Sequence, residues 1–277
     1  MAIVPHQGRA QATNLAREAI GWLTEHGHEP IVPTGDADAC GLEEWALPEA
    51  KFDDSIDLAV SLGGDGTMLR AVDLVTAGGT PVLGVNVGHL GYLTECEPDA
   101  LLGSLKRFFD GDHSIEERMT LAVAVGNQPP ALALNEAWVE KTQPGHTVRM
   151  AVTVGGEPFV TYAADGLIVA TPTGSTAYNL SVRGPIASPT LRALIMTPVS
   201  PHQLFDFSLV LEGDEEVAVE ILDGRSATLL VDGREVCELG AGERVTCKAG
   251  PRDAKLVTFG PRNFHRIVKQ KFGLTDR

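Results

Sequence analysis

The segment Ser61-Leu62-Gly63-Gly64-Asp65-Gly66-Thr67 places one carboxylate among three glycines, a pattern that can serve phosphate chemistry. The apolar run 57–62 predicts a strand covered on both faces, and apolar residues at helical spacing follow from Met68 to Val75. Glycines between a strand and a helix let backbone N–H groups approach phosphate oxygens. Because Asp65 would repel phosphate, we interpret it as the proton acceptor of an attacking hydroxyl or as a metal ligand. The alternative is a tight turn in which Asp65 only caps the helix.

The composition is that of a soluble globular protein. The 277 residues are 43% hydrophobic and 21% charged, and they are enough for two domains. A formal net charge of −15 argues against a nucleic-acid or anionic-membrane partner, and 5% aromatic residues argue against a stacking surface for single strands. A phosphate site in so acidic a chain needs local positive potential from backbone N–H groups, a divalent cation or a few arginines.

Targeting and metal signals are missing from the sequence. No apolar run reaches the roughly 18 residues of a membrane span, and the first residues lack the basic and apolar regions of a secretory signal. The four cysteines (Cys40, Cys96, Cys237 and Cys247) are scattered, without the spacing of metal ligands. We therefore expect a cytoplasmic protein with reduced thiols and no protein-held metal.

Residues 1–112 alternate between strand and helix patterns. Short apolar runs at 2–4, 31–32, 57–62 and 81–85 predict strands, and helices are expected over 15–23, after the glycine turn, and after Pro98. The acidic stretch 34–50 reads as an irregular connection. This alternation predicts an α/β domain with a Rossmann-like parallel sheet covered by helices.

The pattern beyond His113 is all-β and resembles a β-sandwich. Strands are expected at 121–125, 132–140, 148–154, 159–162, 167–170, 209–211, 217–221, 227–231 and 245–248, with one helix at 176–182. The basic segment 263–271 predicts a helix that returns to the first domain. The expected domains are 1–112 plus about 255–277, and 113–254.

Four segments together carry a family signature. They are Gly63-Gly64-Asp65-Gly66-Thr67, the run 84–93 with its Gly88-His89-Leu90-Gly91 turn, Asn135-Glu136, and Asp165-Gly166 followed by the run 171–179. In order and spacing they resemble the NAD kinases, which phosphorylate the 2′-hydroxyl of the adenosine ribose of NAD to make NADP. The glycine turn is shared with lipid kinases and phosphofructokinases, whereas Thr-Pro-Thr-Gly-Ser-Thr-Ala-Tyr after Asp-Gly is far more diagnostic.

The resemblance implies a role for each matching position. Asp65 would be the proton acceptor, and Gly63, Gly64, Gly66 and Thr67 would border the transferred phosphoryl group. The expected NAD contacts are Asp65, Gly66, Asn135, Glu136, Asp165, Thr173, Thr176, Ala177, Tyr178, Asn179, Leu180 and Ser181. Arg70, His146, Ala163, Ser200 and Arg234 fall at ligand-contacting positions whose identities vary within the family.

The side-chain chemistry agrees with these roles. A secondary hydroxyl needs a carboxylate to orient it and accept its proton. The Asn135 amide can pair with an adenine edge, and Glu136 can accept ribose hydroxyl bonds. Short hydroxyls beside a glycine suit a pyrophosphate, and Tyr178 offers a flat face for a ring. Taken alone, Asn135-Glu136 could be solvated surface and 171–176 a capped helix start.

Three positions depart from the family pattern. Val182-Arg183-Gly184-Pro185 stands where Ala-Gly-Gly-Pro is usual, which puts Arg183 near the phosphates or on a subunit surface. Arg234 replaces a common Gln. Ala163 is small where some members carry a bulky charged residue, and from this we hypothesise that NADH is accepted as well as NAD.

The expected partners are NAD and ATP, with Mg²⁺ or another divalent cation accompanying ATP. The sequence leaves polyphosphate open as the donor. Family members generally complete their sites across subunits, so a homodimer or homotetramer is expected. Two other functions remain: a kinase of another hydroxyl, such as a lipid headgroup, and a non-catalytic dinucleotide sensor.

Overall fold

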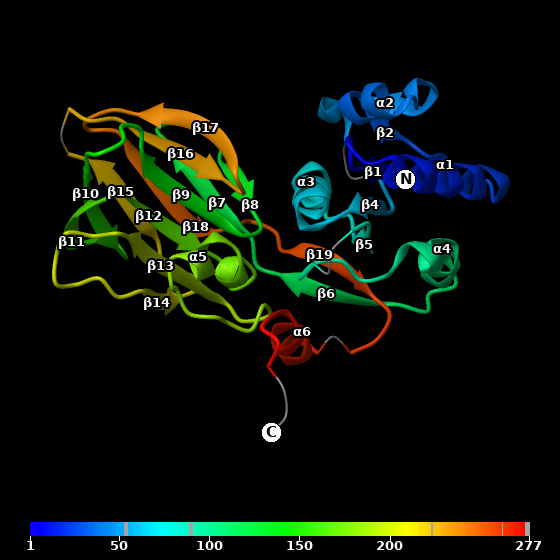
Figure 1. Cartoon of the computed structure of the whole chain (residues 1–277). Helices are drawn as coiled ribbons and strands as arrows, with labels where there is room; N and C mark the ends of the chain where they lie inside the picture. Colours follow the sequence, from blue (N-terminus) through cyan, green and yellow to red (C-terminus); the bar gives the residue numbers. More distant parts are fainter. Residues whose placement is uncertain (53–54, 89–90, 223, 262, 275–277) are drawn as a thin grey trace. The chain divides into compact units, whose positions relative to one another are not determined.

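The chain forms two compact units in a computed structural model that describes residues 1–52, 55–88, 91–222, 224–261 and 263–274 (Figure 1). One unit comprises Met1–Glu117 and Ala254–Arg277, and the other comprises Arg118–Asp253. His89 and Leu90 of the expected Gly88–Gly91 turn lie outside the described residues.

A parallel sheet forms the centre of the first unit, as predicted. Its strand order is β1-β4-β5-β19-β6, and the pairs β1–β4, β4–β5 and β5–β19 are parallel. The strands are β1 (Ala2–Pro5), β4 (Ala59–Gly63), β5 (Val82–Asn86), β19 (Ala254–Thr258) and β6 (Ser114–Arg118). Every residue of β1, β4 and β5 is buried, which is expected of strands covered on both faces.

Helices cover both faces of this sheet. Alternate residues of β4 and β5, such as Val60 and Leu83, pack in one core with α1 (Ala10–Glu25) and α4 (Leu101–Phe109). The opposite face meets α3 (Asp65–Val75), because a Cβ on Gly84 would lie 3.1 Å from Met68 Sδ. Figure 1 shows α3 beside β4.

The prediction of an irregular connection over 34–50 was wrong. The segment contains α2 (Thr34–Cys40), two 3₁₀ turns (Glu43–Trp45 and Glu49–Lys51) and β3 (Ala46–Leu47), which pairs in parallel with β2 (Val32–Pro33). Helix α2 has little helical propensity of its own, but Ala37 and Cys40 are buried in the core of the unit. Tertiary packing therefore stabilises it.

The second unit is a sandwich of two antiparallel sheets, and the all-β prediction is confirmed. The first sheet has the order β11 (Glu157–Ala164), β10 (Val148–Val154), β15 (Val217–Ile221), β18 (Arg244–Ala249), β7 (Leu121–Val125), β8 (Ala131–Ala133). The second has the order β14 (Leu209–Glu212), β13 (Ala193–Val199), β12 (Gly166–Ala170), β9 (Glu136–Lys141), β16 (Ala227–Val231), β17 (Arg234–Leu239). Alternate residues of both sheets, such as Val123, Met150, Val139 and Val169, form a single core.

The outer face of the second sheet is also covered. Ile168, Ala170 and Ile195 pack against Trp138 and Tyr178 there. The covering segment is a 3₁₀ turn (Gly174–Thr176) followed by α5 (Tyr178–Ser181), so the helix expected at 176–182 is shorter than predicted.

Several strand predictions needed correction. The strand expected over 132–140 is interrupted at Leu134-Asn135, between β8 and β9. Strands β6, β13, β17 and β19 were not predicted. The last of these carries the chain back into the parallel sheet, and α6 (Phe264–Lys271) follows it in the first unit. Lys271 Nζ lies 4.3 Å from the centre of the Tyr92 ring, so α6 returns to that unit as expected. No helix in the described part of the chain is long and apolar enough to cross a membrane.

Candidate active site

The glycine turn joins β4 to α3 in the first unit. β4 ends at Gly63, and Gly64 is the N-cap of α3. A Cβ on Gly63 would lie 2.1 Å from Thr67 Oγ1, whereas a Cβ on Gly66 would meet nothing within 4 Å. Only glycine at position 63 therefore lets the buried Thr67 side chain pack against the end of the strand.

The Asp65 carboxylate does not cap its own helix. Its Oδ2 accepts the backbone N–H of Tyr92 at 2.9 Å, and its Oδ1 accepts that of Leu93 at 3.0 Å. A Cβ on Gly91 would come within 2.2 Å of Oδ1, so a glycine there makes room for the carboxylate. These two bonds fix the orientation of the carboxylate, and each oxygen keeps a lone pair for a hydroxyl proton.

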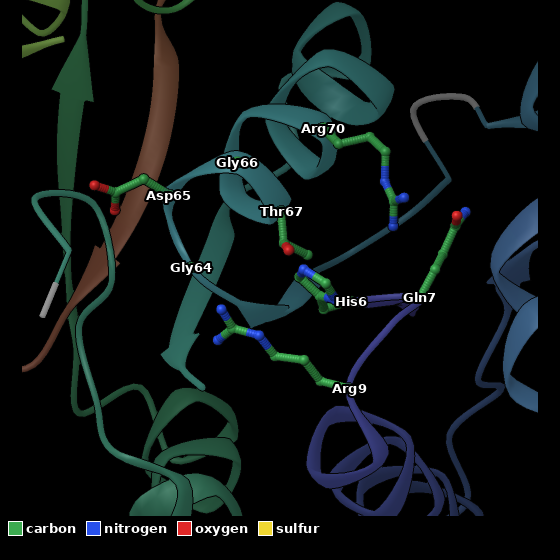
Figure 2. Close-up of a pocket in the computed structure, with 8 residues that line it drawn as sticks. All are labelled: His6, Gln7, Arg9, Gly64, Asp65, Gly66, Thr67 and Arg70. Carbon is green, nitrogen blue, oxygen red and sulfur yellow. The ribbon is translucent and has the colours of Figure 1, made fainter. Parts of the chain in front are cut away.

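A pocket of about 490 Å³ lies beside this turn. It is lined by His6, Gln7, Arg9, Gly64, Asp65, Gly66, Thr67 and Arg70. In Figure 2 the His6, Gln7, Arg9 and Arg70 side chains surround the pocket, while the Asp65 carboxylate points away from them. In a chain of net charge −15, this concentration of donors and positive charge suits an anion.

Three of these lining residues, His6, Gln7 and Arg9, were given no role from the sequence. They follow β1, which pairs in parallel with β4, and the His6 N–H donates to the Leu62 carbonyl at 2.9 Å. The carboxyl ends of parallel strands meet at one edge of the sheet, so this loop and the glycine turn become neighbours. The position of Arg9 just after the first strand was the signal available in the sequence.

Arg70 lines the pocket, but part of its guanidinium is already bound. Its Nη2 donates to Asp36 Oδ2 at 2.6 Å and to the Pro5 carbonyl at 3.0 Å. The buried Asp36 carboxylate also accepts Gln7 Nε2 at 2.8 Å, and burial raises its pKa. Asp36, which lies in the segment expected to be irregular, thus holds two side chains of the pocket in place.

In the second unit, the Asn-Glu and Thr-Pro-Thr-Gly segments lie against each other. The Thr171 N–H donates to the Asn135 carbonyl at 2.8 Å, and Thr171 Oγ1 donates to the Leu134 carbonyl at 2.5 Å. A Cβ on Gly174 would lie 2.1 Å from the Asn135 carbonyl oxygen. The sequence separates these segments, and pairing of β9 with β12 brings them together.

Glu136 is the buried carboxyl of this site. Burial raises its pKa to about 8, with the Asp232 carboxylate acting in the same direction and the Tyr178 backbone N–H opposing. Its Oε2 has no hydrogen-bond partner among the described residues. An unpaired buried acceptor at this position suits a polar ligand group.

The other predicted contacts lie along the 173–181 run. Thr173 Oγ1 accepts the buried Arg118 Nη1 at 3.3 Å, and Thr176 Oγ1 donates to the Thr173 carbonyl at 3.3 Å. Buried Asn179 is used internally: its Nδ2 donates to two carbonyls and its Oδ1 accepts the Thr197 hydroxyl. Ala177, Tyr178, Leu180 and Ser181 lie at the start of α5 or within it.

Asp165, Ala163 and Ser200 also lie close together. The Asp165 N–H donates to the Val199 carbonyl at 2.9 Å, and the Ala163 carbonyl accepts the His202 N–H. Lys141 Nζ lies 2.5 Å from Asp165 Oδ1, an ion pair that the sequence did not reveal. Two further predicted contacts lie elsewhere along the chain: His146 is in the exposed loop between β9 and β10, and Arg234 begins β17.

Comparison with known proteins identifies the family. Residues 1–113 match the ATP-NAD kinase N-terminal domain, and residues 134–259 match the ATP-NAD kinase C-terminal domain. This chain belongs to the ATP-NAD kinase family. It is 39% identical to the NAD kinase of Heliobacterium modesticaldum over 98% of this chain and 97% of that protein.

Two solved structures share the fold of this chain. An NAD kinase from Archaeoglobus fulgidus in complex with ATP has a TM-score of 0.73 and 25% identity, covering 98% of this chain and 97% of that one. Yeast NADH kinase complexed with NADH has a TM-score of 0.89 and 24% identity, covering 100% of this chain and 88% of that one. The chain is thus an enzyme of the ATP-NAD kinase family, a phosphotransferase with an alcohol group as acceptor.

Proposed function

We propose that this enzyme transfers the terminal phosphoryl group of ATP to the 2′-hydroxyl of the adenosine ribose of NAD, with Asp65 as the general base. The proton of the hydroxyl passes to an Asp65 oxygen as the ribose oxygen bonds to the γ-phosphorus, and the bond to ADP breaks. The products are NADP and ADP.

The observation that carries this proposal is the placement of Asp65. Two backbone N–H groups hold its carboxylate, on the side of the glycine turn away from the basic pocket (Figure 2). A base must face the hydroxyl while the phosphates are bound elsewhere, because a carboxylate among the phosphates would repel them. The glycine turn thus presents the base on one side and the proposed phosphate site on the other.

The basic pocket is the proposed site of the triphosphate. Arg9 and Arg70 would donate to its oxygens, together with backbone N–H groups in the first turn of α3. Gly63, Gly64, Gly66 and Thr67 keep the role proposed for them beside the transferred group.

Mg²⁺ or another divalent cation is proposed to enter with ATP. No group of three or more His, Cys, Asp or Glu side chains within the described ranges could hold a metal ion. Magnesium that is bound mainly by substrate phosphates needs few protein ligands. The proposed ion would therefore be carried into the site by the nucleotide. Such an ion neutralises charge on the phosphates.

The second unit is proposed to bind NAD. Asn135 and Glu136 would contact the adenosine, and the hydroxyls of Thr173 and Thr176 the pyrophosphate. Asp165, Tyr178 and the remaining predicted contacts would line the rest of the pocket, with Asn179 supporting the α5 segment from within. We also propose a homodimer or homotetramer in the cytoplasm, where the four unpaired cysteines would stay reduced.

One assay tests the function. The protein is incubated with ATP, Mg²⁺ and NAD, and NADP and ADP are measured. Formation of both supports the proposal. Binding of NAD without release of ADP would indicate a sensor, and ADP release only with another alcohol would indicate a different kinase. Replacing NAD by NADH at equal concentration tests the hypothesis drawn from Ala163, which lack of NADH turnover would end.

A variant tests the base. Asp65→Asn should lower kcat by about 10²–10⁴ because the amide cannot accept the proton. Asp99→Asn is the matched control, since Asp99 is an exposed residue in a 3₁₀ turn of the same unit. An unchanged kcat in Asp65→Asn would remove Asp65 from this role.

A further inference from the structure

Asp232 occupies the tight turn between β16 and β17. Its φ is +48° and that of Gly233 is +76°, so both residues are left-handed, as a two-residue hairpin turn of type I′ requires. The Asp232 N–H donates to the Glu136 carbonyl at 3.0 Å. The backbone of the turn is therefore tied to the first residue of β9.

The Asp232 carboxylate accepts three successive backbone N–H groups. Oδ2 accepts that of Leu134 at 2.7 Å, and Oδ1 accepts those of Asn135 at 2.8 Å and Glu136 at 3.1 Å. These are the residues at which the chain leaves β8 and enters β9. Their N–H groups thus bind a side chain from another hairpin at the break between the strands.

We propose that Asp232 is a positioning residue that orients Asn135 and Glu136 by fixing the backbone of 134–136. This inference rests on the proposed function, in which those two side chains bind the adenosine of NAD. The Asp232 carboxylate binds three N–H groups of the chain itself, so it acts through the segment. Thr171 binds the carbonyl groups of Leu134 and Asn135 in the same segment, and Gly174 leaves room for the Asn135 carbonyl.

An acid is required because both oxygens must accept. In an asparagine, one oxygen could still accept the N–H groups of Asn135 and Glu136. Its amino group would then face the Leu134 N–H, placing donor against donor. A bond to a charged group is stronger than one between neutral groups, so the segment would shift rather than keep this donor–donor contact.

The test separates substrate positioning from general damage. In Asp232→Asn, we expect the KM for NAD to rise about 10- to 100-fold, the equivalent of the lost charged bond, while the KM for ATP changes less than twofold. Calorimetric titration of NAD should show the same loss of affinity. The matched control is Asp214→Asn, an exposed aspartate in the turn between β14 and β15.

A second variant keeps the test open if Asp232→Asn does not fold. Thr171→Val removes the hydroxyl bond to the Leu134 carbonyl from the other side of the segment, and should also raise the KM for NAD alone. Unchanged NAD affinity in folded variants, or equal changes in both KM values, would overturn the inference. Failure of the wild-type protein to form NADP would instead overturn the proposed function.

Discussion

The Glu136 carboxyl keeps its proton at pH values well above those at which a glutamate usually loses it. Its pKa is raised from 4.5 to about 8, first by burial and then by Asp232. Near neutral pH the protonated carboxyl can both donate and accept, which suits a pair of ribose hydroxyls. Between 4.5 and about 8, the folded chain binds more protons than the unfolded chain, so stability must fall as pH rises through this window.

Glu136→Gln should therefore flatten the pH dependence of stability. The amide does not titrate, so the drop in Tm of the ligand-free protein between about pH 5.5 and 8.5 should be smaller than in the wild type. Calorimetry at both pH values measures the difference. Equal drops in the two proteins would contradict the assignment.

Arg9 is the residue on which the basic pocket most depends, because Arg70 already shares its charge with Asp36. Arg9→Ala should raise the KM for ATP about 10- to 100-fold, the size of one charged hydrogen bond, and leave the KM for NAD nearly unchanged. Steady-state kinetics with each substrate varied in turn give both constants. Lys106→Ala, which removes an exposed cation paired with Asp110 on the same unit, is the control. An equal effect in both variants would show that only net charge matters.

At the scale of elements, one crowded glycine in the site and one uncrowded glycine in a helix test how tightly the site is packed. A Cβ on Gly174 would meet backbone atoms of Asn135 at 2.1–2.7 Å, and backbone cannot move aside cheaply. We expect Gly174→Ala to destabilise the fold by about 1–3 kcal/mol and to weaken NAD binding. Gly21 lies inside α1 with open space around it, so Gly21→Ala should stabilise by about 0.5–1 kcal/mol. Urea unfolding measures both, and equal midpoints would refute the contrast.

Elements with strong local signals could be predicted, and those made by distant contacts could not. The strand 59–63 and the helix after it follow from an apolar run, glycines and helical spacing. The break at Leu134-Asn135 depends on Asp232, which nothing in the local pattern indicates. Helix α2 likewise depends on its packing in the core.

The candidate site divides in the same way. Motif residues such as Asp65 and Glu136 could be named from the sequence because their spacing resembles a family. Arg9, Asp36 and Lys141 were given no role from the sequence, because the role of each depends on a neighbour that only the fold supplies. Sheet pairing brings Arg9 to the glycine turn, and Asp36 reaches the pocket through Gln7 and Arg70.

At the scale of the whole molecule, an aromatic patch on the second unit suits the proposed homo-oligomer. Phe159, Phe205 and Phe207 are 42%, 38% and 67% exposed, and their neighbouring ring centres lie 5.7 and 6.2 Å apart. β14, which is the edge strand of its sheet, carries Val210 at 58% exposure. Large apolar side chains that gather at an unpaired edge are typical of an interface.

Phe207→Asp should accordingly lower the oligomeric state. A charge in the centre of a contact between copies would be desolvated without a partner, so dissociation should become visible at micromolar concentration. Sedimentation velocity measures the mass of the species over a dilution series. Val236→Asp is the control, because that exposed side chain lies on β17, at the opposite edge of the same sheet from β14. If Phe207→Asp sediments as the wild type does while NADP is still formed, this patch is not the interface. If the wild type itself is monomeric and active, the site needs no second subunit, and the expectation of shared sites fails with it.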